Sequence, residues 1–188
     1  AYEQPQRLVD TALEWGSRIG VAVEPLMVLT RDQADAAAAA AIDGVSVVML
    51  AGDSSGHLRS ALKDTPVFAS IVALLERGGT VIACGPAAGA LCDPMVDQRG
   101  GGYAFGLGLV PGVAVITECE RLPHDQLERA HSLATTPVID LPTGSAVIRT
   151  DGAWELIGDA VVRILADETI ANGAYVHAHD HLREPGAL

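Results

Sequence analysis

Two short apolar runs, each followed at once by a glycine-rich loop, constrain the fold of this chain most. Residues 45–50 read Val-Ser-Val-Val-Met-Leu and lead into Ala-Gly-Asp-Ser-Ser-Gly at 51–56. Residues 80–84 read Thr-Val-Ile-Ala-Cys and lead into Gly-Pro-Ala-Ala-Gly-Ala at 85–90. Such apolar runs are typical of parallel strands that are covered on both faces. We therefore expect both runs inside a parallel sheet, with both loops at its carboxyl edge, where these sheets bind ligands.

Helical patterns alternate with these strands. Residues 5–19, 33–41 and 67–77 have helical spacing, and residues 21–29 are predicted to form a further strand. Strands that alternate with helices predict an α/β fold with helices on both faces of a mostly parallel sheet. After residue 102 the pattern changes to short strands, predicted at 113–117, 138–141, 145–149, 154–157 and 160–164, with a hairpin turn at Thr150-Asp151-Gly152.

The loop at residues 85–90 has the context of a nucleophile elbow. In such an elbow, a G-x-S-x-G turn between a strand and a helix raises a serine hydroxyl into a crevice. Ala87 holds the serine position in this chain, and its neighbours are Pro86 and Ala88. A methyl group cannot attack a carbonyl carbon, so the elbow lacks its nucleophile.

This loop and several later motifs resemble the cyanophycinase-like serine peptidases, which include aspartyl dipeptidase. Their elbow, G-x-S-A-G-A, is matched except at the serine, and residues 106–113 (G-L-G-L-V-P-G-V) are similar to their G-L-G-L-L-P-G-V. Residues 144–147 (G-S-A-V) are similar to a late G-T-A-L, and residues 92–97 resemble an actinobacterial branch. The resemblance covers residues 45–158. It implies a flavodoxin-like, class I glutamine amidotransferase-like three-layer sandwich with a small C-terminal antiparallel extension.

The resemblance also implies where the other catalytic groups should stand. Glu118 holds the position of the general-base histidine, and Thr143 holds the position of the acidic residue. With Ala87, all three catalytic positions are changed, which favours natural divergence and a non-hydrolytic homologue. A serine-to-alanine change engineered at Ala87 in an active peptidase is the alternative.

A binding function is expected to survive the loss of these side chains. The resemblance places the backbone N–H donors of an oxyanion hole at Gly52-Asp53 and at Ala88, and backbone donors do not depend on side-chain identity. We therefore predict a small acidic or peptide-like ligand, or a regulatory or structural partnership with an active relative. His57, in the same loop as Asp53, is either a ligand contact or a surface residue. No cofactor is expected.

An active hydrolase with a displaced nucleophile or a metal is the second hypothesis. Cys119 follows Glu118 directly, whereas Cys84 ends an apolar strand and is expected to be a buried, inert thiol. The metal-like cluster is His177, His179 and His181. It lies in a predicted flexible tail, residues 170–188, for which we favour a solvated state over a metal site.

Charge and cysteine usage limit the other classes. The net charge of −12 disfavours nucleic acid and anionic membrane surfaces as partners. Three cysteines without metal spacing, and the lack of a signal peptide or a long apolar segment, predict a reduced, cytoplasmic protein.

The chain is predicted to form one domain over residues 1–188. Members of the resembled family begin with a strand, a glycine-rich loop and a second strand, and this sequence starts where that second strand ends. We therefore expect the N-terminal strands to be absent, which would leave strand edges open. A homodimer, or a complex that supplies these strands, is the predicted assembly.

Overall fold

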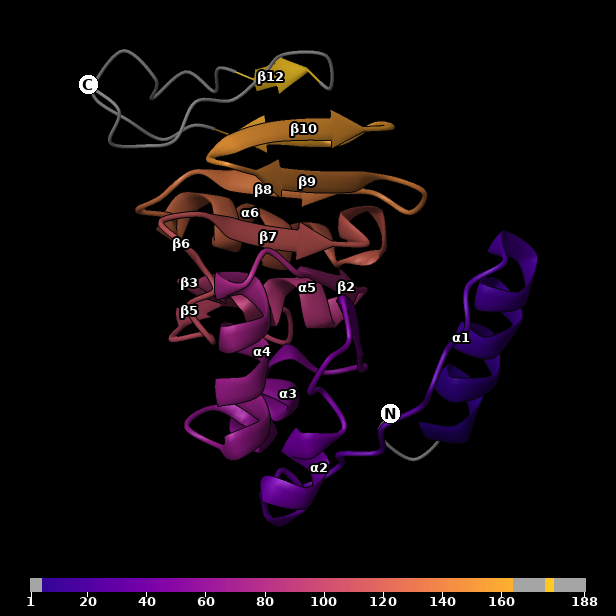
Figure 1. Ribbon diagram of the computed structural model, residues 1–188. Helices are drawn as coiled ribbons and strands as arrows, with labels where there is room; N and C mark the ends of the chain where they lie inside the picture. Colours follow the sequence, from indigo (N-terminus) through magenta and orange to yellow (C-terminus); the bar gives the residue numbers. More distant parts are fainter. Residues whose placement is uncertain (1–4, 164–174, 178–188) are drawn as a thin grey trace. The chain divides into compact units, whose positions relative to one another are not determined.

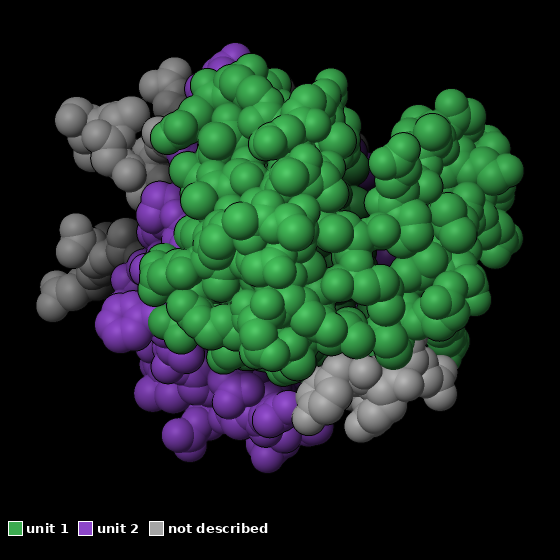
Figure 2. Space-filling view, turned by 60° about the horizontal axis from the view of Figure 1, so that its bottom comes forward, with its two compact units in different colours: residues 1–88 green, residues 89–188 purple. Residues whose placement is uncertain are grey.

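The computed structural model describes residues 5–163 and 175–177. The chain forms two compact units, residues 1–88 and residues 89–188, which are coloured separately in Figure 2. Together the units hold a mixed α/β arrangement of short sheets, with parallel pairs in both units and antiparallel strands toward the C-terminal end. None of the described helices has the length and apolar character needed to cross a membrane.

The first unit has four helices in its described part and one pair of strands (Figure 1). β1 (Val47–Ala51) and β2 (Thr80–Cys84) pair in parallel, with Val47 opposite Thr80 and Ala51 opposite Cys84. The helices are α1 (Pro5–Ile19), α2 (Ala36–Ala40), α3 (Ser55–Leu62) and α4 (Pro66–Glu76), with a 3-10 turn at Arg31–Gln33. Helix α5 (Pro86–Leu91) begins directly after the turn that ends β2 and continues into the second unit, which starts at Gly89.

Local sequence explains where these helices begin. Ser54 accepts a hydrogen bond from the His57 N–H at the start of α3, and Thr65 accepts one from the Phe68 N–H at the start of α4. Pro66 occupies the first turn of α4, where its missing N–H costs no helical hydrogen bond.

Two predictions for the first unit are corrected by the structure. Residues 21–29 are not a strand, because between residues 22 and 28 no backbone hydrogen bond joins them to a described residue. β1 and β2 are both predicted inside a sheet, but among the described residues they form a two-stranded sheet in which each is an edge strand. A parallel strand needs a neighbour on each side to be internal, and the described part of this unit contains only two paired strands.

The second unit is built on a four-stranded sheet with the order β12-β11-β8-β7. β7 (Ala114–Thr117) and β8 (Val138–Leu141) are parallel and joined through α6 (His124–Leu133). β11 (Val161–Arg163) is antiparallel to β8, and β12 (Tyr175–His177) is antiparallel to β11. Smaller pairs are β3 (Cys92–Asp93) with β6 (Val110–Pro111), and β4 (Met95–Asp97) with β5 (Gly102–Ala104).

The predicted C-terminal hairpin is confirmed. β9 (Ala146–Thr150) and β10 (Ala153–Ile157) are antiparallel and connected by Asp151 and Gly152, which have φ angles of 50° and 80°. Two consecutive residues with positive φ are what a two-residue type I′ turn requires.

Alternation along β7 and β8 supplies two core clusters, one on each face of the sheet. Val113, Val115, Ile139 and Leu141 pack with Trp154 and Leu156 of β10. The residues that point to the other face of the sheet, toward α6, belong to a second cluster of Val96, Ala114, Ile116, Cys119, Ala130 and Val138. All four residues of β7 and all four of β8 are buried, as expected for parallel strands that are covered on both faces.

Candidate functional site

The carboxyl ends of β7 and β8 bring two predicted catalytic positions to one edge of the second unit. The strands are parallel and in register, with Thr117 opposite Leu141. Glu118 follows β7 directly, and Thr143 stands two residues after β8 ends. Loops at the carboxyl edge of parallel strands are where this kind of sheet presents functional groups.

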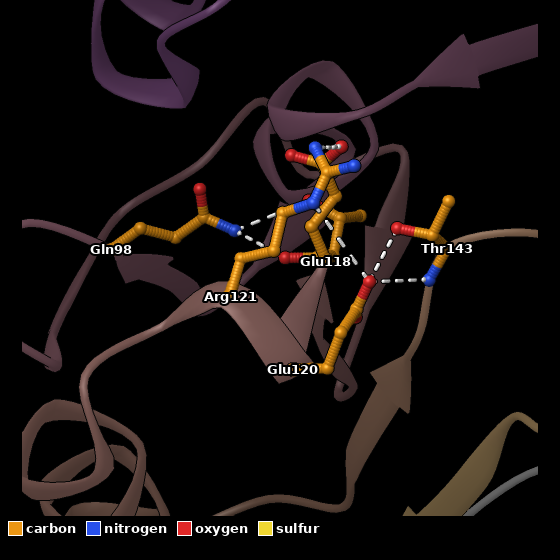
Figure 3. A network of polar contacts seen from close by, with 6 residues as sticks. Gln98, Glu118, Glu120, Arg121 and Thr143 are labelled. Atoms are coloured by element: carbon orange, nitrogen blue, oxygen red, sulfur yellow. Dashed lines mark hydrogen bonds and ion pairs between the residues drawn. The ribbon is translucent and has the colours of Figure 1, made fainter.

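The Glu118 and Thr143 side chains are hydrogen-bonded to other residues and not to each other. A general base and the acidic residue that orients it would have to be hydrogen-bonded to each other. The Thr143 hydroxyl donates a short hydrogen bond to Oε1 of Glu120, and its N–H donates to the same atom at 3.1 Å (Figure 3). Glu118 instead accepts a hydrogen bond from Nη1 of Arg121 at 2.7 Å. Glu120, which no sequence motif marks, is thus the acidic group beside Thr143.

The backbone at Glu118 has an unusual conformation. Its φ and ψ are 50° and 39°, in the left-handed region, and its carbonyl accepts the Arg121 N–H at 2.8 Å to close the 3-10 turn at Cys119–Arg121. A residue other than glycine pays roughly 1–2 kcal/mol for this conformation. Such outliers concentrate at functional sites and tight turns.

Gln98 supports the end of β7 from the neighbouring chain segment. Its Nε2 donates to the Thr117 carbonyl oxygen at 3.0 Å and lies 3.1 Å from the Thr117 hydroxyl (Figure 3). Gln98 was also missed from the sequence, because a glutamine beside a run of glycines carries no pattern of its own.

The charge state of this edge follows from its hydrogen bonds. The hydrogen bond from the Thr143 hydroxyl is the main cause that lowers the pKa of Glu120, with further help from backbone N–H groups and from Arg121. The Glu120 carboxylate is therefore ionised at neutral pH. Glu118 and Arg121 form an exposed ion pair, which contributes little to stability by itself.

The elbow spans the chain boundary between the units, with residues 85–88 in the first and residues 89–90 in the second. Ala87 has no exposed surface, and the positive φ falls on Gly85 (57°) rather than on the nucleophile position. The Ala88 N–H, a predicted oxyanion donor, donates to the Gly85 carbonyl at 2.9 Å. A ligand oxygen at this donor would have to share or displace that hydrogen bond.

The other predicted ligand contacts lie in the loop between β1 and α3. Gly52 is half-buried and Asp53 is exposed. His57 is half-buried, and its Nε2 lies 2.8 Å from the carbonyl oxygen of Leu29. His57 therefore ties the end of residues 21–29 to the first turn of α3.

The cysteines do not support thiol chemistry. Cys84 was expected to be buried but is exposed, and partial desolvation still raises its pKa. Cys119 is buried, and its pKa is raised to about 11, chiefly by burial and then by the charges of Asp140 and Glu120. Both thiols are therefore protonated at neutral pH, whereas the nucleophile must be a thiolate.

The histidine cluster of the tail falls mostly outside the described residues. His177 ends β12, while His179 and His181 lie outside the described part, as does the predicted tail at 170–188 except for residues 175–177. Within residues 5–163 and 175–177, no group of three His, Cys, Asp or Glu side chains is arranged to hold a metal ion.

A buried contact between a histidine and an aspartate in the second unit was also missed from the sequence. His131 of α6 and Asp140 of β8 lie together under the sheet, with Nε2 3.0 Å from Oδ1. The Tyr103 hydroxyl donates to the Ala130 carbonyl at 2.9 Å, and burial, followed by the charge of Asp140, raises the pKa of Tyr103 to about 12. The signal in the sequence was an aspartate inside the apolar run at 138–141.

The fold of the chain is similar to that of a solved peptidase. The chain is similar to the crystal structure of a peptidase from an acI-B1 Actinobacterium, with a TM-score of 0.79 and 21% sequence identity. The match covers 96% of this chain and 78% of that one. No family model and no curated protein sequence matches the chain. The similarity therefore establishes the fold.

Proposed function

We propose that this protein is a non-hydrolytic homologue of the cyanophycinase-like serine peptidases that binds a small acidic or peptide-like ligand. The observation that carries the proposal is Ala87, since the nucleophile position holds a methyl group with no exposed surface. Its fold would be the flavodoxin-like, class I glutamine amidotransferase-like sandwich, which the peptidase similarity supports.

The general-base and acid positions support the same proposal. Glu118 is paired with Arg121, and Thr143 is bonded to Glu120, so neither position offers an imidazole–carboxylate pair. His131 directs Nε2 to the buried Asp140 and is only 10% exposed, which removes it from substrate. A general base must lie within hydrogen-bond reach of the proton it abstracts.

A thiol hydrolase is less well supported. Cys119 packs in the core cluster with Ala130 and Val138, and its pKa of about 11 leaves it as a thiol at neutral pH. Ligand binding needs no such group. The backbone N–H groups of the loop at Gly52 and Asp53, in the first unit, offer donors for a carboxylate or an amide carbonyl.

The proposal is tested by reversal at the elbow. The unchanged protein, Ala87→Ser and the double variant Ala87→Ser/Glu118→His are incubated with aspartyl dipeptides and β-aspartyl-arginine, and binding is followed by calorimetry. We expect binding without turnover in the first two proteins, because an unactivated serine is a poor nucleophile and base assistance contributes roughly 10²–10⁴-fold.

Each other outcome has a distinct meaning. Substantial hydrolysis by Ala87→Ser alone would show that a base is in place and would favour an engineered alanine. Turnover by the unchanged protein that a thiol reagent abolishes would replace the proposal with a thiol hydrolase. The absence of binding to all these ligands would leave the regulatory or structural role in its place.

A further inference from the structure

One half-buried arginine of the first unit has no acceptor for its buried donor. Arg59 lies in α3, and its Nε is buried without a hydrogen-bond partner among the described residues. No described carboxylate forms an ion pair with its guanidinium. A guanidinium stays charged at neutral pH and only donates hydrogen bonds, and most buried donors in folded proteins have an acceptor. Arg59 is thus a charged donor that no described residue satisfies.

Two other arginines of the same unit donate to backbone carbonyls. Nη1 of Arg31 donates to the Lys63 carbonyl oxygen at 2.5 Å, and its Nη2 donates to the Asp64 carbonyl oxygen at 3.2 Å. Nη2 of Arg77 donates to two carbonyl oxygens, each at 3.2 Å. These contacts fasten the helices of the unit to neighbouring turns. Arg59 makes no contact of this kind with the described residues, so a role in holding the fold together does not account for it.

The position of Arg59 on α3 places the base of its side chain against the interior. Ser55, Arg59 and Leu62 are spaced four and three residues apart and therefore share one face of the helix. Ser55 is 7% exposed and Leu62 is 3% exposed. Because side chains on an α-helix lean toward its amino end, the stem of Arg59 leads toward the first turn of α3.

The first turn of α3 adds donors of its own. The Ser54 side chain accepts the His57 N–H at 3.3 Å, and the Ser54 carbonyl accepts the Leu58 N–H at 3.0 Å. Among the described residues, the N–H groups of Ser55 and Gly56 have no acceptor, and the turn contains no acidic side chain. Free N–H groups at this end of a helix favour an anion. The guanidinium and the helix start therefore both call for negatively charged oxygen atoms.

We propose that Arg59 binds a small oxyanion beside the first turn of α3. The donors of its guanidinium form a fork that matches two oxygens of a carboxylate or a phosphate group, and the N–H groups of Ser55 and Gly56 bind the same anion. The site lies within the first unit and uses no residue of the second. It does not depend on the proposed peptide-like ligand, because the anion alone supplies the oxygens that these donors need.

The test titrates the full chain, isotope-labelled for NMR, with sodium acetate and separately with sodium phosphate. Sodium chloride at the same ionic strength is the blank. The signals followed are the Nε–H of Arg59 and the backbone N–H groups of Ser55 and Gly56. Arg59→Gln removes the charge, and Arg59→Lys keeps the charge without the fork. Arg18→Gln, at an exposed arginine of the same unit, is the matched control.

We expect acetate or phosphate to shift all three signals along one saturable curve in the unchanged protein. Arg18→Gln should bind equally well. Arg59→Gln should weaken the binding measured at Ser55 and Gly56 at least about tenfold, because charge-assisted hydrogen bonds are lost. Arg59→Lys should bind with an intermediate affinity. The Arg59 signal of the unchanged protein gives a result even where Arg59→Gln does not fold.

The two anions distinguish the source of the oxygens. A response to acetate alone would support the site with a carboxylate ligand, and a response to phosphate alone would support it with a phosphorylated ligand. Both responses together would support a site that recognises the charge and the paired oxygens.

Several results would overturn the proposal. An Arg59 signal that moves with neither anion would show that the guanidinium does not bind one. Equal shifts with chloride would show general screening of charge. Unchanged binding in Arg59→Gln would show that the anion is held elsewhere. Binding that appears only after Asp53→Asn would show that the exposed carboxylate of Asp53 is the partner of Arg59 in solution.

Discussion

Nε2 of His131 lies 3.0 Å from Oδ1 of Asp140, inside the layer between α6 and the sheet of the second unit. The two side chains are 10% and 9% exposed. A carboxylate only accepts hydrogen bonds, so the pairing assigns the Nε2 proton to the bond with Asp140. The contact joins the last turn of α6 to the middle of β8.

Breaking this pair should destabilise the second unit strongly. His131→Ala removes one hydrogen-bond donor from the buried Asp140 carboxylate, and we expect the free energy of unfolding to fall by about 2 kcal/mol. Urea unfolding measures the change, and His124→Ala, at an exposed histidine of the same helix, is the control. Equal effects of the two substitutions would show that the pair has no special role.

Gly106 should not tolerate a side chain. A Cβ atom there would lie 1.7 Å from the Cys92 carbonyl oxygen and 3.1 Å from the Ala90 carbonyl oxygen, both of which belong to backbone. Gly106→Ala should therefore cost about 3 kcal/mol of stability, because the chain must move to relieve the overlap. Gly102→Ala, where no atom lies within 4 Å, should change the melting temperature little. A small loss of stability in Gly106→Ala would mean that the backbone around residue 106 moves easily to make room for the methyl group.

The contact between Thr143 and Glu120 should make this edge sensitive to acid. The lowered pKa of Glu120 means that the contact stabilises the fold above the ordinary glutamate pKa. That contribution is lost as the pH falls through the lowered value. Thr143→Val should raise the pKa of Glu120 toward its ordinary value, as read from the carboxyl carbon by NMR. Thr150→Val, at an exposed residue of β9, should leave the pKa of Glu120 unchanged.

The three cysteines should differ sharply in reactivity. Cys84 is exposed, whereas Cys92 and Cys119 are buried with pKa values of about 12 and about 11. At pH 8, a thiol with a pKa of about 11 is ionised in roughly one molecule in a thousand. Iodoacetamide followed by mass spectrometry should therefore modify Cys84 first. Earlier modification of Cys119 would reopen the thiol mechanism.

Local backbone chemistry made several elements predictable from the sequence alone. The strand, turn and helix at residues 80–91 are present because Gly85 takes the positive φ that ends the strand and Pro86 begins the helix. The hairpin at Asp151 and Gly152 is present for a similar reason. These features depend on the conformational preferences of neighbouring residues, and residue identity determines those preferences.

Contacts between distant segments were decided by the tertiary structure. Residues 21–29 have the composition of a strand, yet a ladder also needs a neighbouring backbone in register, and no described segment supplies one. Glu120, rather than Glu118, contacts Thr143, because a left-handed residue and a 3-10 turn follow β7 and redirect the chain. His131 and Asp140 meet because α6 packs on β8. The sequence determined which residues form turns and helix starts. Folding alone determined which backbone segments and polar side chains became neighbours, since a hydrogen bond or an ion pair depends on distances that residue identity does not specify.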